Sequence, residues 1–259
     1  MFKEYFILLL LGHVLGDFYI QTANMSEKKE KSLHWVLIHC FCYWVIMLLI
    51  CLPIISWEIA LAATVAAILH MVIDLIKFAY TLKKIKKGVM TLTIKRNVFF
   101  ADQALHGVCL FGITYWVIRS NVPINAWKII EDFFGIVGVS EGLIISWALA
   151  LLVIHKPANI VIQKLLMIYK PESKDDDKKE NKKEDKKKDN NAGRFIGTVE
   201  RIIMLMFLSI GQFAAIGLVL TAKSIARYDK IAKEPEFAEY YLLGTLLSTM
   251  LVIIASFIM

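Results

Sequence analysis

Long apolar runs are the feature that most constrains how this chain can fold. They cover residues 5–20, 35–55, 59–75, 98–118, 143–154, 202–220 and 242–259. Several of them approach or reach the roughly 20 residues that a helix needs to cross a bilayer. The chain is 58% hydrophobic, with a mean hydropathy of +0.58, whereas soluble domains are roughly 45–50% apolar. We therefore predict an all-α polytopic integral membrane protein, a helical bundle of about seven transmembrane helices.

A charged block separates the fifth run from the sixth. Residues 173–191 contain eight lysines, seven acidic residues and no apolar residue, so this block cannot bury surface in a core. We predict a disordered linker over residues 171–193. Because the charges of this block nearly cancel, it argues against a nucleic-acid site, and the predicted partner of the chain is the lipid bilayer.

The apolar runs and the linker divide the chain into four predicted segments. They are a four-helix membrane core (1–120), an extracytoplasmic loop with the fifth helix (121–170), the linker (171–193) and a C-terminal transmembrane helix pair (194–259). Basic residues gather at 26–32, at 83–97 and in the linker, and cytoplasmic loops are rich in Lys and Arg.

This charge pattern predicts a multi-pass protein of the plasma membrane with its N-terminus outside and the linker in the cytoplasm. The segment 223–240, which carries four basic residues, conflicts with the rule that basic loops face the cytoplasm. If all seven spans cross the membrane in turn, this segment lies outside. It is then a surface helix, or the sixth span does not cross as predicted.

Three His/Asp pairs with a spacing of four residues lie inside the predicted spans. They are His13 and Asp17, His70 and Asp74, and Asp102 and His106. This spacing puts both side chains of a pair on one helix face. The order is reversed in the last pair, whose span runs in the opposite direction. All three aspartates are therefore expected roughly 6–9 Å inside the cytoplasmic face and the histidines roughly 12–15 Å inside.

Two further ionisable residues are expected near the same depth. His39 lies about 9 Å inside the second span, and Glu200 lies near the start of the sixth. Ionisable side chains inside a membrane span are costly, so they normally face the bundle interior and mark function.

Imidazole and carboxylate groups together suit a divalent metal such as zinc, iron or manganese. The predicted metal ligands are His13, Asp17, His70, Asp74, Asp102 and His106. Asp102 is also a candidate general base, and His39 a candidate catalytic residue or additional ligand. The set exceeds the four ligands of one structural zinc, which indicates two metals or one metal with outer His–Asp partners.

Three functions use these residues differently. The first is a membrane-embedded, metal-dependent hydrolase or transferase that acts on a lipid-like substrate near the cytoplasmic leaflet. The second is a transporter or channel for a metal ion or a proton. The third is a non-catalytic membrane partner protein whose buried pairs only fix helix packing.

The last two spans carry charged residues of their own. We expect Arg201 to reach the interface and Glu200 to pair with a neighbour. The alternative is that Glu200 joins the site and Arg201 holds an anionic headgroup. We expect Lys223 and Arg227 to form ion pairs with Glu239 across a helical hairpin.

The motifs LLGHVLGDFYIQT, HMVIDLIK and ADQALHG together resemble an uncharacterised family of bacterial integral membrane proteins, a domain of unknown function. The resemblance covers roughly residues 5–120. The tail, from GRFIGTVERI to EYYLLGTLLS, resembles the C-terminal part of the longer members. The resemblance implies a membrane protein and brings no established reaction.

Overall fold

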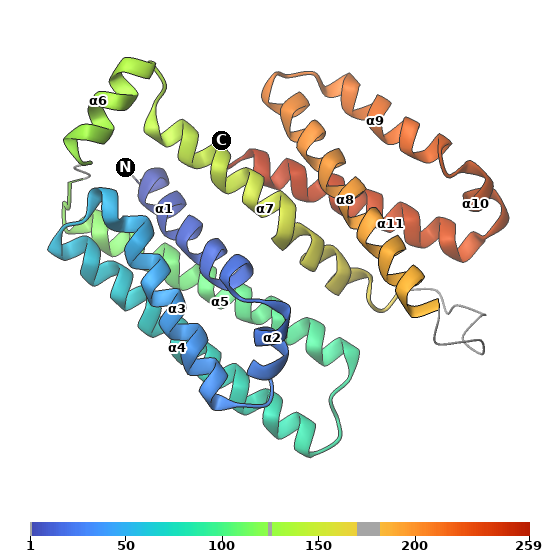
Figure 1. Ribbon diagram of the computed structural model, residues 1–259, viewed down its shortest axis with the longest axis horizontal. Helices are drawn as coiled ribbons and strands as arrows, with labels where there is room; N and C mark the ends of the chain where they lie inside the picture. Colours follow the sequence, from blue (N-terminus) through green and yellow to red (C-terminus); the bar gives the residue numbers. More distant parts are fainter. Residues whose placement is uncertain (1, 124–125, 170–181) are drawn as a thin grey trace. The chain divides into compact units, whose positions relative to one another are not determined.

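The computed structural model describes residues 2–123, 126–169 and 182–259 (Figure 1). Regular structure in these ranges is helical throughout. Five helical segments are long and apolar enough to cross a membrane, namely Leu33–Ile54, Trp57–Lys86, Leu92–Arg119, Glu141–Leu166 and Pro235–Ser256. The protein is therefore an all-helical membrane protein, with five such segments where the sequence predicted about seven spans.

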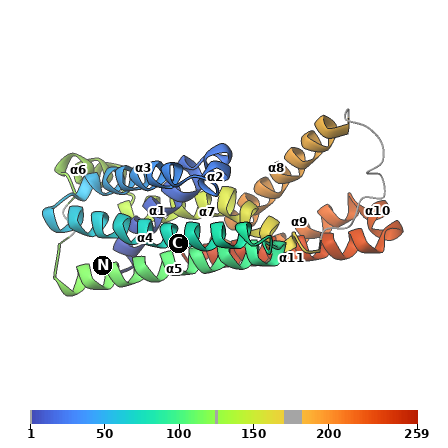
Figure 2. The same ribbon diagram turned by 90° about the horizontal axis from the view of Figure 1, so that it is seen from below.

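The chain forms two units, Met1–Leu149 and Ala150–Met259. The helical segments of the first unit are α1 (Phe2–Val14), the π-helix η1 (Leu15–Ile20), α2 (Ala23–Lys29), α3 (Leu33–Cys51), the 3₁₀-helix η2 (Leu52–Ile54), α4 (Trp57–Lys86), α5 (Leu92–Arg119), α6 (Lys128–Val137) and the start of α7 (Glu141–Leu166). Helices α1, α3, α4 and α5 run side by side (Figures 1 and 2), and each of them packs against two of the others.

Side-chain caps fix where the two long helices of this unit begin. The Ser56 hydroxyl accepts a hydrogen bond from the Ile59 amide before α4, and the Thr91 hydroxyl accepts one from the Ile94 amide before α5. Each cap satisfies a backbone N–H that has no partner within its helix. The starting residue in turn sets the depth at which the aspartates and histidines of α4 and α5 lie.

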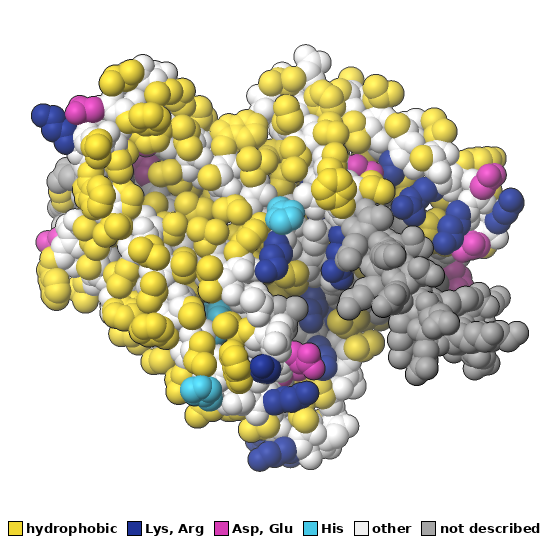
Figure 3. Space-filling model, in the orientation of Figure 1, with side chains coloured by type: hydrophobic (Ala, Val, Ile, Leu, Met, Phe, Trp, Pro, Cys, Tyr) yellow, Lys and Arg dark blue, Asp and Glu magenta, His cyan; other side chains and the backbone are white. Residues whose placement is uncertain are grey.

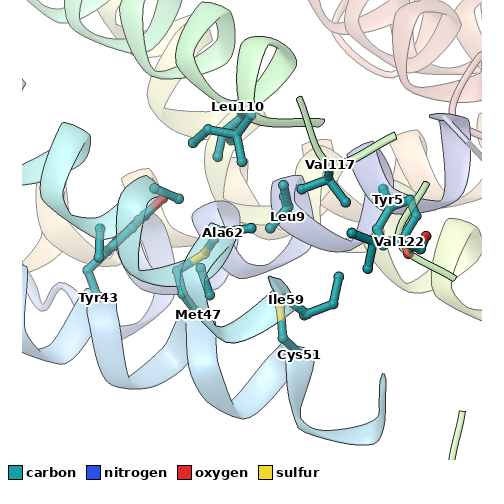
Figure 4. Packing of buried hydrophobic residues seen from close by; sticks show 14 residues of the cluster. Tyr5, Leu9, Tyr43, Met47, Cys51, Ile59, Ala62, Leu110, Val117 and Val122 are labelled. Atoms are coloured by element: carbon teal, nitrogen blue, oxygen red, sulfur yellow. Dashed lines mark hydrogen bonds between the residues drawn. The ribbon is translucent and has the colours of Figure 1, made fainter. Parts of the chain in front are cut away.

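The core of the first unit is apolar at the end away from α2 (Figure 4). Small residues on α4, Ala62, Ala63 and Ala66, are almost fully buried and let the neighbouring helices approach closely. Met47 and Tyr43 of α3 fill the space between α1 and α4. Apolar side chains therefore pack in one part of the bundle. The neighbouring part, on the other side of Tyr43, contains polar side chains.

The outward faces of the same helices are also apolar. Phe41, Ile76 and Val108 are 61%, 65% and 69% exposed, and each lies on a different long helix. Hydrophobic side chains cover much of the face shown in Figure 3. Helices that are apolar on both the inner and the outer side are typical of a bundle surrounded by lipid.

The second unit contains the rest of α7, then α8 (Lys182–Ser209), α9 (Phe213–Ile225), α10 (Tyr228–Lys233) and α11 (Pro235–Ser256). The predicted sixth span, residues 202–220, is wrong as a single helix. The chain turns at Gly211, whose φ of +72° favours glycine, and α9 packs back against α8. Apolar composition is continuous across this turn, so hydropathy alone does not reveal it.

The predicted linker, residues 171–193, lies partly outside the described residues. From Lys182 onward the chain is helical, which differs from the expected lack of regular structure. The lysines that dominate this stretch are good helix formers, so a composition that cannot build a core still permits a helix.

Candidate metal centre

Seven ionisable residues from five helical segments meet inside the first unit. We call them the His/Asp cluster; its members are His13, Asp17, His39, His70, Asp74, Asp102 and His106. Six of them are almost fully buried, and Asp17, on η1, is partly buried. All six predicted metal ligands and His39 therefore lie in one place, as the shared depth of the pairs predicted.

The four histidines form one layer of the cluster. The ring of His106 lies 5.1 Å from that of His13 and 4.3 Å from that of His70, measured between centroids. His39 adds a fourth ring at 5.2 Å from His70, and its Nε2 lies 3.1 Å from that of His70. Tyr43 stacks on His70 with centroids 3.7 Å apart, so these imidazoles are held between aromatic and imidazole rings.

The aspartates lie against this layer. His39 Nε2 is 3.3 Å from Asp17 Oδ1 and 3.5 Å from Asp74 Oδ2, so one imidazole contacts carboxylates of two helical segments. His70 Nε2 lies 3.4 Å from Asp74 Oδ2. His39 thus joins η1 and α4, although its own helix, α3, carries no aspartate.

Two lysines that the sequence analysis assigned no role in the site complete its electrostatics. Lys29 donates from Nζ to Asp74 Oδ2 at 2.7 Å, and its side chain is only 9% exposed. Lys77 donates to Asp102 Oδ2 at 2.7 Å and lies 3.9 Å from Asp74 Oδ1. The cluster and the two lysines together contain three carboxylates and two ammonium groups. When the imidazoles are neutral, their net charge is therefore −1.

Gln103 and Tyr43 are further polar partners that the sequence analysis did not identify. Gln103 donates from Nε2 to Asp17 Oδ2 at 2.7 Å. The two ring nitrogens of His13 lie 3.2 Å from the Tyr43 hydroxyl and 3.4 Å from Gln103 Oε1. Asp17 and His13 are therefore oriented by side chains of other helices and not only by each other.

Two of these four additional residues could have been predicted from the sequence. Lys77 follows Asp74 by three residues and shares its helix face, and Gln103 adjoins Asp102. Lys29 lies in the basic junction 26–32, which was interpreted only as a marker of the cytoplasmic side. Its buried contact depends on α2 folding back onto α3, and no local pattern predicts that.

A π-helix carries Asp17. The helix changes from α to π at Leu15, and such short π segments are frequent at functional sites. Glycines on both sides of this change bring α1 and η1 close to α3. A Cβ added to Gly12 would lie 2.6 Å from Met47 Sδ, and one added to Gly16 would lie 2.7 Å from Tyr43 Cδ2.

The cluster holds most of the unsatisfied polar atoms of the described chain. Six of the eight buried side-chain atoms without a hydrogen-bond partner there belong to it: His39 Nδ1, His70 Nδ1, Asp74 Oδ1, Asp102 Oδ1 and both ring nitrogens of His106. Buried polar atoms are normally paired. A set of unpaired oxygens and imidazole nitrogens is what a bound cation would satisfy.

Asp74, Asp102 and His106 are the best placed of these for a metal ion. Their ligand atoms all lie within 4.8 Å of one another, and all three side chains are buried. Each also has a buried atom without a hydrogen-bond partner. Two carboxylates and one imidazole are a set that zinc, iron and manganese accept.

Charge favours one ion over two. One divalent ion would change the net charge from −1 to +1, whereas two would leave three positive charges in a buried site. Uncompensated buried charge is strongly unfavourable. Of the two alternatives left open by the sequence, this balance favours a single ion with the remaining His and Asp groups around it.

The charged residues of the second unit have other partners. Glu200 pairs with Lys223 at 2.6 Å between Nζ and Oε2, so the expectation that Glu200 has a neighbouring partner is confirmed. Lys223 was expected to pair with Glu239, and the structure pairs it with Glu200. Arg201 is 2% exposed, so the expectation that it reaches the interface is wrong.

Comparison with known proteins gives a family match within the first unit. Residues 5–131 match the model of a family described as a protein of unknown function (DUF3307). The matched segment contains the whole His/Asp cluster. No curated protein and no solved structure shows a detectable match to the chain.

We predict that Gly16→Ala disturbs the cluster from outside it. The new Cβ would overlap the Tyr43 ring, which stacks on His70, so either η1 or the ring must shift. Overpacking of this kind costs about 1–3 kcal/mol, measured as a lower midpoint of thermal unfolding in detergent. Gly107→Ala is the matched control, because its Cβ would meet no atom within 4 Å; an equal loss of stability in both variants would contradict the prediction.

Proposed function

We propose that the His/Asp cluster binds one divalent metal ion and that the first unit is a membrane-embedded hydrolase or transferase acting on a lipid-like substrate. The observation that carries the proposal is that Asp74, Asp102 and His106 converge and that each has a buried atom without a hydrogen-bond partner. A cluster that served only to fix helix packing would be expected to pair its polar atoms with one another.

A metal ion in such a site activates water and polarises a phosphoryl or carbonyl oxygen. The residues around it would orient the reactants. Gln103 and His39 hold the Asp17 carboxylate from two sides, and Lys29 neutralises Asp74. Asp102 has one oxygen on Lys77 and one without a hydrogen-bond partner, which suits a ligand or a general base.

Lys77 supports an anionic, lipid-like substrate. Its side chain is 31% exposed while its ammonium group contacts Asp102, so it connects the buried cluster with the surface of the bundle. A phosphate or carboxylate group that reached Lys77 from the lipid would find a cation there, and the ester bond behind that group could reach the cluster. In this proposal Lys77 positions the substrate next to the ligands.

A proton pathway is the second candidate function, and one observation favours it. Contacts of 3.4 Å or less connect four ionisable groups in series: Asp17 to His39, His39 to His70, and His70 to Asp74. Chains of Asp and His serve as proton relays in membrane transporters. Proton flux through liposomes that contain the protein, lost in Asp17→Asn, would support this candidate.

The metal prediction is tested on protein purified in detergent after growth with zinc, iron and manganese. We expect about one divalent ion per wild-type chain, measured by elemental analysis, and less than a tenth of that in Asp74→Ala. Removing Asp74 deletes a ligand and leaves Lys29 without its carboxylate. Asp229→Ala is the matched control, because Asp229 is exposed on α10 of the second unit, and it should retain the ion. Folded wild-type protein without metal would refute the metal site.

The catalytic part of the proposal has a separate test. Metal-loaded protein is incubated with vesicles made from a total bacterial lipid extract, and the lipids are compared by mass spectrometry. We expect a lipid species to be consumed by the wild type and not by Asp102→Asn or Asp74→Ala. If the wild type holds metal but leaves every lipid unchanged, the ion is not used for lipid chemistry.

The turn at Gly211 suggests a different membrane topology for the second unit. In this topology the segment 223–240 no longer lies outside. We propose that the N-terminus lies outside and that α8 crosses outward and α9 returns, which places the basic segment 223–240 in the cytoplasm. The part of α8 that is largely apolar, residues 195–209, is about 22 Å long and α9 about 20 Å. The positive-inside rule favours this arrangement.

Single cysteines in a cysteine-free variant test this orientation. We expect Gly88→Cys and Glu234→Cys to be shielded from a membrane-impermeant thiol reagent in intact cells, and Asn121→Cys to be labelled. Seven alternating spans would instead place residues 88 and 234 on opposite sides. Labelling of Glu234→Cys together with Asn121→Cys would therefore reject the α8–α9 return.

A further inference from the structure

Arg201 is a buried cation in the second unit. It is 2% exposed and has four hydrogen bonds. Its Nε donates to the Ile154 carbonyl at 2.6 Å, Nη1 donates to Ser248 Oγ at 3.3 Å, and Nη2 donates to Asn159 Oδ1 at 2.8 Å and to Thr198 Oγ1 at 3.1 Å. Every one of these acceptors is neutral. The hydrogen bonds therefore satisfy most of the guanidinium without compensating its charge.

The nearest acidic residue in sequence forms its ion pair with another cation. Glu200 adjoins Arg201, but its carboxylate receives the Lys223 ammonium at 2.6 Å. Within the described part of the chain, no Asp or Glu forms an ion pair with Arg201. A buried charge without a partner is costly, and inside a membrane protein such a residue is expected to have a partner or a function.

Two buried hydroxyls on α11 also lack partners. They are Tyr241 Oη and Thr245 Oγ1, the only unsatisfied buried side-chain atoms among the described residues outside the His/Asp cluster. Tyr241, Thr245 and Ser248 are spaced four and three residues apart, so they share one face of α11. Ser248 already contacts Arg201, which places this face towards the guanidinium.

The guanidinium also has a donor left over. An arginine side chain carries five N–H groups, and the four hydrogen bonds leave one on Nη1. Nη1 is the nitrogen that faces Ser248, and it lies 3.4 Å from where a Cβ of Gly197 would be. The Arg201 guanidinium on α8 therefore has an unused donor and no ion-pair partner among the described residues, and α11 carries two buried hydroxyls without a hydrogen-bond partner.

Basic residues continue from this place along α11. Lys223 Nζ lies 5.6 Å from the centroid of the Tyr241 ring, and the Arg227 guanidinium carbon lies 6.0 Å from it. Lys230 lies over Phe237 at 4.3 Å. Lys, Arg, Asp and Glu side chains lie together at the end of the unit where α10 lies (Figure 3). Residues 223–240 carry four basic and four acidic side chains, so these cations lie among acidic groups.

We propose that the second unit binds a phosphate-type oxyanion between α8 and α11, with Arg201 as its cation and the hydroxyls of Thr245 and Tyr241 as hydrogen-bond donors. Phosphate fits because guanidinium groups pair with it through parallel N–H donors and because its oxygens accept several hydrogen bonds. The anion is either free phosphate or the phosphate of a lipid headgroup. This proposal is independent of the metal centre, because its residues all belong to the second unit.

The test measures how far anions stabilise the full-length protein after lipid has been removed by washing in an uncharged detergent. The probes are inorganic phosphate and phosphatidylglycerol. For a ligand at about a hundredfold excess over its Kd we expect the midpoint of thermal unfolding to rise by roughly 5–10 °C. A rise with phosphate alone identifies free phosphate, and a rise only with phosphatidylglycerol identifies a headgroup.

Three variants test whether the rise in unfolding midpoint comes from an anion bound at Arg201 and Thr245. Arg201→Gln and Thr245→Val should each abolish at least nine tenths of the rise, whereas Arg119→Gln, an exposed arginine of the first unit, should leave it unchanged. Thr245→Val also remains decisive if Arg201→Gln fails to fold. Because Thr245 Oγ1 has no partner, a purely structural role predicts that this variant is as stable as the wild type and responds equally to the probes.

Two outcomes would overturn the proposal. One is folded, lipid-free wild-type protein whose unfolding midpoint rises with neither probe. The other is a full response in Thr245→Val, which would place the anion elsewhere. The measurement uses no metal and no lipid turnover, so its result is independent of the metal and activity tests on the first unit.

Discussion

Compensation of three buried carboxylates by two lysines is the interaction on which the rest of the first unit depends. Asp17, Asp74 and Asp102 come from three helical segments and would repel one another at close range. Lys29 and Lys77 reduce that repulsion, and their contacts require α2 to fold back and α4 to keep its register with α5. The apolar packing around Met47 then holds the helices at the distance that these ion pairs need.

The same compensation limits what the cluster can bind. A site with three free carboxylates would attract two divalent ions, whereas this one keeps a single net negative charge. The histidine layer contributes ring nitrogens that could bind a cation, and these add no charge when the rings are neutral. Selectivity for one cation can therefore come from the lysines as much as from the ligands, because they determine how much positive charge the site accepts.

Much of the His/Asp cluster was predictable from the sequence because two simple rules apply to it. Residues four apart share a helix face, and a reversed order on an antiparallel helix keeps equivalent groups at one depth. These rules brought together all three pairs, and the depth of His39 in the second predicted span added the seventh residue. The rules did not predict Lys29, because its position depends on a loop and a short helix. They did not predict Tyr43, because an aromatic residue in an apolar run has no distinctive pattern.

The second unit shows where the same reasoning fails. Hydropathy treats residues 202–220 as one run, but a single glycine with positive φ reverses the chain within it. Arg201 was expected at an interface because arginine normally reaches water. Its burial depends on Asn159, Ser248 and the Ile154 carbonyl, which come from helices 42 or more residues away in sequence. Such long-range acceptors are visible only after folding.

The π-helix at Leu15–Ile20 has a consequence for how the N-terminal segment can vary. A π turn amounts to one residue more than the α-helix needs at that point. Deleting one residue there would restore an α-helix and change the direction of the side chains within the π segment. Asp17 would then leave Gln103 and His39 even though its identity is unchanged. The length of this segment is therefore under the same constraint as the chemistry of its residues, and substitutions are tolerated more readily than insertions or deletions.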